Sequence, residues 1–267
     1  TQSRSSAASD VYKRQQMIQL PLSFLTRPIA HRGLHDVQNE RPENSSAAIA
    51  AAISGGYGIE IDVQLSKDGD AMVFHDYHLN RVTSQNGAIA QKNSEWLSKV
   101  TLSGGTDTIA TLNQTLAQIS GKVPLLIEIK DQDGNLGSNV GQLELKVAQA
   151  LKTYVGDVAV MSFNPNSLAA FAESNLNIPI GLVTDRFEAA DWPTIPHSTR
   201  LHLRAMNDLD RIGASFISHN HKYLSDLQSF VPQLLGLPIL CWTIQSAKSE
   251  KKAREIATNI TFEGYLA

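Results

Sequence analysis

Short β-branched runs alternate along this chain with alanine- and leucine-rich stretches, and this alternation constrains the fold more than any other feature. The runs typical of strands are 28–32, 58–62, 71–76, 124–130, 158–163, 180–185, 215–219, 239–244 and 259–264. The stretches typical of helices are 43–54, 140–154, 167–174 and 246–258. Strands that alternate with helices predict repeated βα units around a largely parallel sheet.

The length of 267 residues, 42% of them hydrophobic, suits one closed barrel of eight βα units. We therefore predict an α/β fold, a TIM-type (β/α)8 barrel. Because the sequence predicts nine strands and a barrel of this type has eight, we expect at least one strand to lie outside the barrel. The eight residues between Asp62 and Ala71 are too few for a helix but span about 26 Å when extended. They predict that strand 71–76 runs parallel to its predecessor, so that Asp62 and His75 end at one rim and a turn at 67–69 lies at the other.

The beginning of the chain carries little fold information. Residues 1–16 are polar, serine-rich and without periodicity, and we interpret them as a disordered, non-native extension. The barrel is then one domain over 17–267. The basic and apolar run at 13–25 imitates a signal peptide, but it contains Pro21 and has no small-residue cleavage site, so we do not interpret it as one.

Composition excludes several classes of partner and indicates a compartment. The net charge is −3 and the basic residues are scattered, which argues against binding to nucleic acid. No run approaches the roughly 18 apolar residues of a membrane span, so we expect no stable membrane insertion. A single cysteine, Cys241, cannot form an internal disulfide and fits a cytoplasmic location.

Candidate catalytic residues follow from one rule, that barrel enzymes carry their working residues at the carboxyl ends of the strands. The residues selected in this way are His31, Arg32, Glu60, Asp62, His75, Asp76, Glu128 and Lys130. In the two acidic strands, the period of two places Glu60 with Asp62, and Glu128 with Lys130, on the lumen side. Three carboxylates in a confined space require a counter-charge, and hard oxygen ligands suit Mg²⁺ or Ca²⁺. The alternative is that these carboxylates lie on the surface of strands assigned in the wrong phase.

The other candidates also have two interpretations each. Paired imidazoles are suited to acid and base catalysis, whereas a lone histidine at a strand end is more often a satisfied polar residue. The planar guanidinium of Arg32 suits a phosphate, or forms a salt bridge to Asp36 or Glu43. Lys130 supplies a second cation or neutralises Glu128. Trp242 forms an apolar wall of the site or packs in the core.

The same residues, in this order, resemble the glycerophosphodiester phosphodiesterase family. The matching pieces are AHRG (30–33), RPENSSAAIAAAISGG (41–56), IEIDVQLSKDGDAMVFHDYHLNRVT (59–83), LLIEIK (125–130), SFNP (162–165) and CWTI (241–244). The resemblance covers nearly everything from Pro28 onward. The chain departs from the family at its end, which reads NITFEGYLA where members commonly have a strand ending in T-D-x-P.

The resemblance implies a barrel that holds one divalent cation, Mg²⁺ or Ca²⁺, through Glu60, Asp62 and Glu128. It implies further that His31 and His75 are the acid/base pair, and that Arg32 and Lys130 contact the phosphate. The segment 77–110 corresponds to the family's insertion, which is expected to cover the site and help select the alcohol.

The function implied is hydrolysis of glycerophosphodiesters, small-molecule substrates of lipid and glycerol metabolism, to glycerol 3-phosphate and an alcohol. Two alternatives stay open. One is a phospholipase D-like or cyclising phosphodiesterase that acts on lysolipids, and the other is a non-catalytic barrel that binds phosphate or sugar ligands. The sequence leaves open the head group, the choice of cation, the oligomeric state and which histidine is the acid.

Overall fold

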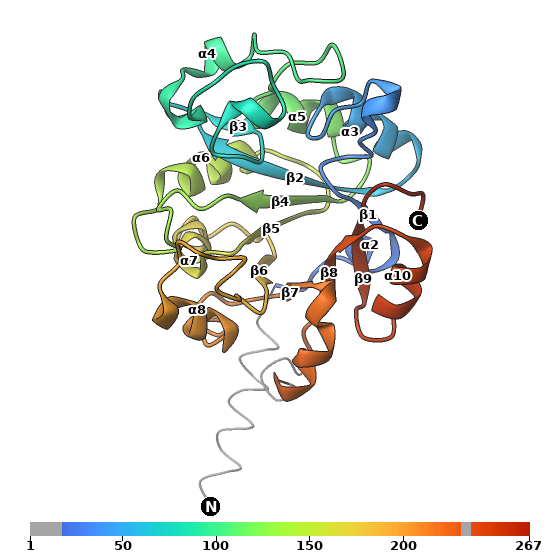
Figure 1. Cartoon of the computed structure of the whole chain (residues 1–267), viewed down its shortest axis with the longest axis vertical. Helices are drawn as coiled ribbons and strands as arrows, with labels where there is room; N and C mark the ends of the chain where they lie inside the picture. The colour runs from blue at the N-terminus through green and yellow to red at the C-terminus, as the bar shows by residue number, and fades with distance from the viewer. Residues whose placement is uncertain (1–17, 231–235) are drawn as a thin grey trace, which may run out of the picture.

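The computed structural model describes residues 18–230 and 236–267 (Figure 1), so the predicted extension at 1–16 lies outside the described residues. Eight parallel strands close into a barrel, because β1 pairs both with β9 and with β2. The eight strands in chain order are β1 (Ile29–Ala30), β2 (Gly58–Leu65), β4 (Leu125–Ile129), β5 (Val158–Ser162), β6 (Ile180–Thr184), β7 (Phe216–Asn220), β8 (Ile239–Ile244) and β9 (Asn259–Phe262). The predicted barrel is confirmed.

Helices cover the outside of the barrel, as Figure 1 shows. They are α3 (Ser46–Ser54), α5 (Leu112–Ile119), α6 (Gln142–Leu151), α7 (Pro165–Ala172), α8 (His197–Arg204), the 3₁₀ segment η4 (His221–Phe230) and α10 (Ala247–Ala253). Several begin at a capping side chain, because the first N–H groups of a helix lack partners within it. Ser45 caps α3 by accepting a hydrogen bond from Ala48 N, and Thr111 forms a capping box with Gln114 on α5. No described helix has the length and apolar character needed to span a membrane.

Two apolar layers follow from the alternation of side chains along the strands. The outer layer lies between strands and helices and includes Ile59, Ile61, Val63, Leu125, Ile127 and Ile129. The inner layer fills the lumen with Leu126, Ala159, Met161, Val183, Phe216 and Leu240. The phase predicted for the acidic strands is therefore correct, because Ile61 and Ile129 face the helices and the charged residues between the outward positions face the lumen.

The short helix α2 (Ser23–Thr26) closes the amino-terminal end of the barrel. Phe24 is fully buried against the inner layer, and its carbonyl accepts a hydrogen bond from Asn259 Nδ2 at 2.7 Å. Ser23 Oγ donates to Asp157, the residue before β5, at 2.5 Å. Since this end is sealed, access to the lumen is from the carboxyl ends of the strands.

The strand that lies outside the barrel is β3 (Ala71–Val73), and its direction differs from the prediction. It runs antiparallel to β2, with Val63 opposite Val73, so the two form a hairpin. The predicted parallel course was wrong because β2 continues to Leu65, past the rim, and the chain then turns back at once. Asp62 and His75 still meet, because Phe74 N donates to the Asp62 carbonyl at 3.0 Å.

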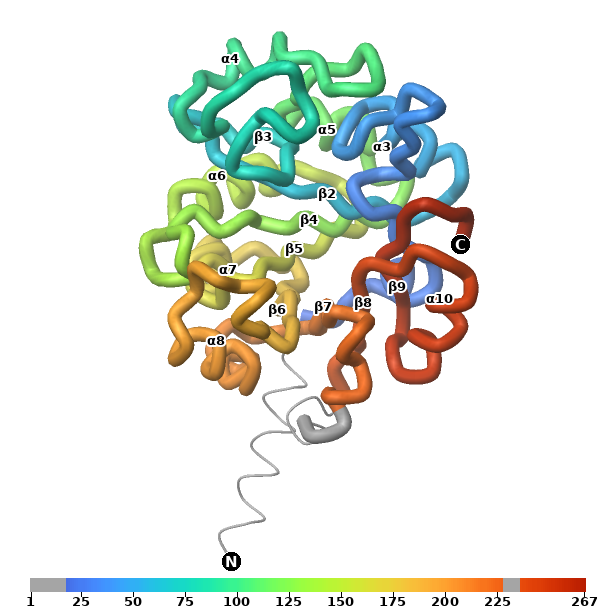
Figure 2. The backbone as a smooth tube through the Cα atoms, in the orientation of Figure 1, coloured from blue at the N-terminus to red at the C-terminus, as the bar shows by residue number. Residues whose placement is uncertain are grey.

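The segment after β3 forms a small unit with an apolar core of its own, seen beside β3 and α5 in Figure 2. It contains the short elements η2 (Leu79–Arg81), η3 (Ile89–Gln91) and α4 (Ser94–Leu97). Its core is Met72, Phe74, Leu79, Ile89, Leu97, Val100, Leu102 and Ile109. Because Met72 and Phe74 belong to this core, the inserted unit includes β3 as well as the predicted 77–110.

The packing of the lumen generates one prediction. Gly181 lies opposite Phe216 in the pairing of β6 and β7, and a Cβ added to Gly181 would be 2.2 Å from the Phe216 ring. We expect Gly181→Ala to lower the free energy of unfolding by about 1–3 kcal/mol, because a fully buried ring must move. Urea denaturation would measure this. The added change Phe216→Leu should recover part of the loss, and an unchanged Gly181→Ala protein would contradict the packing.

Candidate active site

Six of the eight residues selected from the strand ends line one inner cavity of about 120 Å³ in the lumen. Its walls include His31, Arg32, Glu60, His75, Glu128, Lys130, Phe163 and Trp242. A larger outer pocket of about 570 Å³ shares His75, Glu128, Lys130, Phe163 and Trp242 with it. The two pockets therefore adjoin each other at these five residues.

The three carboxylates of Glu60, Asp62 and Glu128 converge within the lumen. Each offers one oxygen, and these oxygens lie within 4.8 Å of one another. All three residues are buried, and Glu60 Oε1 has no hydrogen-bond partner among the described residues. A buried carboxylate oxygen without a donor is costly unless a cation occupies the adjacent space. The set therefore fits a hard divalent cation, which prefers oxygen ligands.

Electrostatics divide the carboxylates into two kinds. Burial, followed by the charges of Asp62 and Glu128, raises the pKa of Glu60 well above its ordinary value. Burial also opposes ionisation of Asp62, but Lys130, His75 and Arg32 together hold the pKa of Asp62 far below its usual value. Without a cation, these surroundings therefore favour the protonated form of Glu60, and a bound cation would favour the ionised form.

Lys130 extends the acidic strand and neutralises part of the cluster. Its Nζ lies 2.6 Å from Glu128 Oε1 and 3.4 Å from Asp62 Oδ1. Burial opposes the charge on Lys130, but Glu128 and Asp62 outweigh it and raise the pKa of the ammonium above its ordinary value. Lys130 is thus a fixed positive charge at the junction of the inner cavity and the outer pocket.

Arg32 follows His31 in a left-handed conformation, with φ 53°. Its backbone N–H donates to Glu60 Oε2 at 2.9 Å, and its Nη1 donates to Glu43 Oε1 at 2.8 Å. Its Nε lies 3.3 Å from Asp62 Oδ2. Of the two salt bridges considered for Arg32, the structure contains the one to Glu43, whereas Asp36 pairs with Arg41.

Asn44 is a site residue that the strand-end rule did not select. Ser45 is the cap of α3, and the buried Asn44 instead donates from Nδ2 to Asp62 Oδ2 at 3.0 Å. Its Oδ1 accepts a hydrogen bond from Asp62 N at 3.3 Å. Asn44 thereby fixes the orientation of the Asp62 carboxylate.

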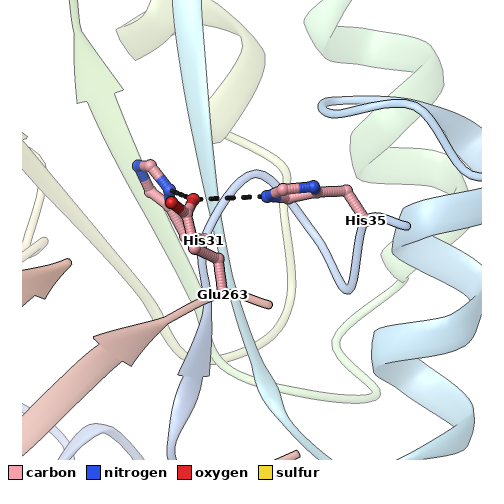
Figure 3. A group of neighbouring side chains, drawn as sticks. All are labelled: His31, His35 and Glu263. Atoms are coloured by element: carbon pink, nitrogen blue, oxygen red, sulfur yellow. Dashed lines mark hydrogen bonds and ion pairs between the residues drawn. The ribbon is translucent and has the colours of Figure 1, made fainter. Parts of the chain in front are cut away.

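His31 is held by a residue that the sequence analysis missed. Its Nδ1 lies 2.5 Å from Glu263 Oε2, which also accepts from His35 Nε2 at 3.3 Å (Figure 3). Gln245 donates to the other Glu263 oxygen at 2.8 Å. Burial lowers the pKa of His31 although the Glu263 hydrogen bond opposes this, so the ring is neutral at pH 7. Glu263 follows β9, and the strand-end rule applied to 259–264 would have selected it.

His75 is held in a similar way. Its Nδ1 lies 2.5 Å from Asp76 Oδ1, and its carbonyl accepts a hydrogen bond from Gln64 Nε2 at 2.9 Å. Both imidazoles are thus bound to a carboxylate at Nδ1, which leaves Nε2 as the nitrogen available for exchange of a proton. The Nε2 of His31 lies 4.0 Å from Glu60 Oε2, at the edge of the acidic cluster.

Aromatic side chains form the wall of the outer pocket. Trp242 lies on β8, and its Nε1 donates to the Ser218 carbonyl at 3.0 Å. Its ring meets Phe163 edge to face at 5.5 Å, and Trp192 packs on Phe163 at 5.0 Å. From the inserted unit, Tyr77 and His78 also line this pocket, so the insertion borders the site at its first residues.

A second group of potential metal ligands occurs within residues 18–230 and 236–267, and it does not include the two nearby histidines His219 and His221. That group is His31, His35 and Glu263, already described as a hydrogen-bonded set. His219 ends β7 and is buried, with its Nδ1 2.7 Å from Thr184 Oγ1. The structure gives His219 a structural partner and leaves it away from the catalytic cavity.

Comparisons with known proteins agree on one family. The sequence profile described as the glycerophosphoryl diester phosphodiesterase family matches residues 31–259. A glycerophosphodiester phosphodiesterase of Bacillus altitudinis is 32% identical over 169 residues, which are 60% of this chain and 67% of that protein. The Bacillus subtilis protein YhdW is 28% identical over 242 residues, 86% of this chain and 91% of that one.

Solved structures share the fold. A phosphodiesterase of Oleispira antarctica, crystallised with sn-glycerol-3-phosphate as its product, superposes with a TM-score of 0.72. It is 22% identical, and the match covers 90% of this chain and 94% of that one. A glycerophosphodiester phosphodiesterase of Parabacteroides distasonis gives a TM-score of 0.69 at 21% identity, over 88% and 92% of the two chains.

The raised pKa of Glu60 generates a prediction for cation binding. In the metal-free protein, this shift favours folding at low pH, and the contribution is lost as the pH rises through the folded-state pKa. At mildly acidic pH we expect Mg²⁺ or Ca²⁺ to displace about one proton, because Glu60 must ionise to coordinate. Calorimetry in buffers of different ionisation enthalpy measures that proton. Glu60→Gln should bind more weakly and release none, whereas equal heats in all buffers would contradict the assignment.

Proposed function

This chain belongs to the glycerophosphoryl diester phosphodiesterase family, and on that premise we propose that it hydrolyses glycerophosphodiesters to glycerol 3-phosphate and an alcohol with His31 and His75 as acid and base. The single observation that carries the proposal is that both imidazoles line one cavity with Glu60 and Glu128, and that an oxygen of Asp62 lies within 4.8 Å of theirs. The product bound to the Oleispira antarctica phosphodiesterase, sn-glycerol-3-phosphate, supports the same product here.

The substrate's phosphate is proposed to lie in the inner cavity. When bound to Glu60, Asp62 and Glu128, one divalent cation, Mg²⁺ or Ca²⁺, supplies electrostatic stabilisation of the charge that develops on the phosphoryl oxygens. Arg32 and Lys130 add fixed positive charge on the same side, and both are already oriented by carboxylates. Arg32 presents a planar fork suited to two phosphoryl oxygens, whereas Lys130 acts as a point charge.

The two histidines transfer the protons. We propose His31 as the base that takes the proton of the attacking hydroxyl, because burial keeps its ring neutral at pH 7. His75 then protonates the leaving alkoxide. If the attacking group is the neighbouring glycerol hydroxyl, the first product is a cyclic phosphate, and water opens it with the two roles reversed.

The carboxylates at Nδ1 support these roles. Glu263 and Asp76 accept from the Nδ1 atoms of His31 and His75, and this fixes the tautomer in which Nε2 can accept a proton. Each carboxylate also stabilises the imidazolium that forms during the reaction.

The alcohol is proposed to occupy the outer pocket. Its volume of about 570 Å³ suits a small head group, and Trp242 forms part of the wall it shares with the inner cavity. The aromatic wall formed by Phe163, Trp192 and Trp242 also favours a second candidate, a phosphodiesterase that acts on lysolipids with the apolar chain in this pocket. A panel of glycerophosphodiesters and lysolipids, each assayed with Mg²⁺ and with Ca²⁺, would distinguish the two.

The setting proposed for the enzyme is cytoplasmic lipid and glycerol metabolism. Cys241 is free and buried, which fits a reducing compartment, and glycerol 3-phosphate is the product that connects the two kinds of metabolism.

Removal of either imidazole tests the proton transfer. We expect His31→Ala and His75→Ala each to lose essentially all turnover while they keep the fold, because each removes one end of the proton transfer. The assay follows release of glycerol 3-phosphate, and circular dichroism checks the fold. His197→Ala, an exposed histidine on α8, is the control and should stay active. Near-normal activity in either of the first two variants would remove that histidine from the mechanism.

Removal of the cation tests the acidic cluster in the reaction. We expect EDTA to inactivate the enzyme and Mg²⁺ or Ca²⁺ to restore it, because Arg32 and Lys130 alone leave the negative charge of the phosphoryl group and the carboxylates poorly balanced. Full activity of protein shown by elemental analysis to hold no metal would dismiss the cation.

A further inference from the structure

Arg81, in η2 of the inserted unit, binds two carboxylates that come from different parts of the chain. Its Nη1 and Nη2 donate to Glu43 Oε2 and Oε1, both at 2.7 Å. Its Nε and Nη2 donate to Asp76 Oδ2 and Oδ1 at 2.6 and 2.9 Å. Every nitrogen of the guanidinium is therefore engaged, and the two carboxylates are held on two edges of one planar group.

Each of these carboxylates also binds a residue that lines the inner cavity. Glu43 Oε1 accepts from Arg32 Nη1 at 2.8 Å, and Asp76 Oδ1 lies 2.5 Å from His75 Nδ1. The contacts form one continuous series, Arg32, Glu43, Arg81, Asp76 and His75. The series connects Arg32, a proposed phosphate-binding residue, to His75, a proposed acid/base residue, through Arg81, which has neither role.

Charge explains why the middle of the series must be an arginine. Glu43 is largely buried, and burial opposes its charge, but Arg81 and Arg32 outweigh this and lower its pKa. Burial likewise opposes the charge on Asp76, and His75 and Arg81 hold its pKa well below the usual value. Two ionised carboxylates side by side repel each other unless a cation lies between them. A lysine is a point charge and cannot form paired hydrogen bonds with both.

The position of Arg81 is fixed by the inserted unit. Leu79 precedes it on η2 and is fully buried in that unit's core, and Thr83 Oγ1 donates back to the Leu79 carbonyl at 2.7 Å. A cation anchored in this way has a defined place relative to the barrel. The side chain is 46% exposed, so its ion pairs contribute little to global stability.

We propose that Arg81 is a positioning residue that sets the geometry of His75 and Arg32 together, and that the inserted unit contributes to catalysis through it. The inference rests on the proposed function, because it assigns Arg81 a role in that reaction. It predicts that a substitution outside the cavity affects turnover far more than it affects the fold.

The first experiment compares Arg81→Met with Arg81→Lys in the full chain loaded with Mg²⁺ or Ca²⁺. Loss of a residue that orients catalytic groups typically costs about 10- to 100-fold in activity, and we expect Arg81→Met to lower kcat within that range. Arg81→Lys should fall between Arg81→Met and the unsubstituted enzyme, because it restores charge without the fork. Both should keep the melting temperature within a few degrees.

A matched control separates this effect from the loss of any exposed ion pair. Arg254 on α10 is 35% exposed and pairs with Glu250 at 2.7 Å, away from the cavity. Arg254→Met should retain kcat. If Arg81→Met keeps kcat within threefold of the unsubstituted enzyme, or loses no more than Arg254→Met does, the proposal is wrong.

Double-variant cycles then test the two halves of the series. Arg81→Met is combined with Asp76→Asn in one double variant and with Glu43→Gln in another. In each double variant, the fold-loss of kcat should be at least tenfold smaller than the product of the two single losses. The reason is that both substitutions of a pair break the same contact between Arg81 and a carboxylate. Full additivity in both cycles would overturn the proposal. An unsubstituted enzyme that hydrolyses no glycerophosphodiester would instead refute the proposed function, so the two failures are distinguishable.

Discussion

The repulsion among three carboxylates buried in the barrel lumen is the constraint on which the rest of the site depends. Glu60, Asp62 and Glu128 lie too close together to be ionised without positive charge nearby. Lys130 and Arg32 supply part of that charge, and Asn44 supplies a hydrogen bond to Asp62. Burial and the remaining repulsion from Asp62 and Glu128 raise the pKa of Glu60, and Glu60 Oε1 has no hydrogen-bond donor among the described residues. A divalent cation bound beside Glu60 would relieve both conditions.

The two histidines beside this cluster are each oriented by a carboxylate that is itself hydrogen-bonded to another residue. Each imidazole is bound at Nδ1 by a carboxylate, and each of those carboxylates is bound by a further residue, Gln245 for Glu263 and Arg81 for Asp76. Such support narrows the orientations open to the ring and directs Nε2 to one place. The sealed amino-terminal end, where Phe24 plugs the barrel, leaves the carboxyl-terminal face as the side from which substrate enters.

The inserted unit has more than one effect on the site. Its apolar core is separate from that of the barrel. Tyr77 and His78 border the outer pocket, whereas Arg81 reaches across to carboxylates beside the inner cavity. A segment expected to cover the site and help select the alcohol therefore also contacts the carboxylates that hold Arg32 and His75.

Local pattern determined a great deal about this protein. The nine strands, the phase that turns Glu60, Asp62 and Glu128 inward and the family all follow from periodicity and short motifs, because these depend on residues close together in sequence. Which strand leaves the barrel did not follow, since hairpin and parallel return both fit the short link after Asp62. Glu263 with His31, Asn44 with Asp62 and Arg81 with Glu43 also required the tertiary structure. Those contacts join side chains 18 to 232 residues apart, and only the packing of the folded chain brings them within hydrogen-bonding distance.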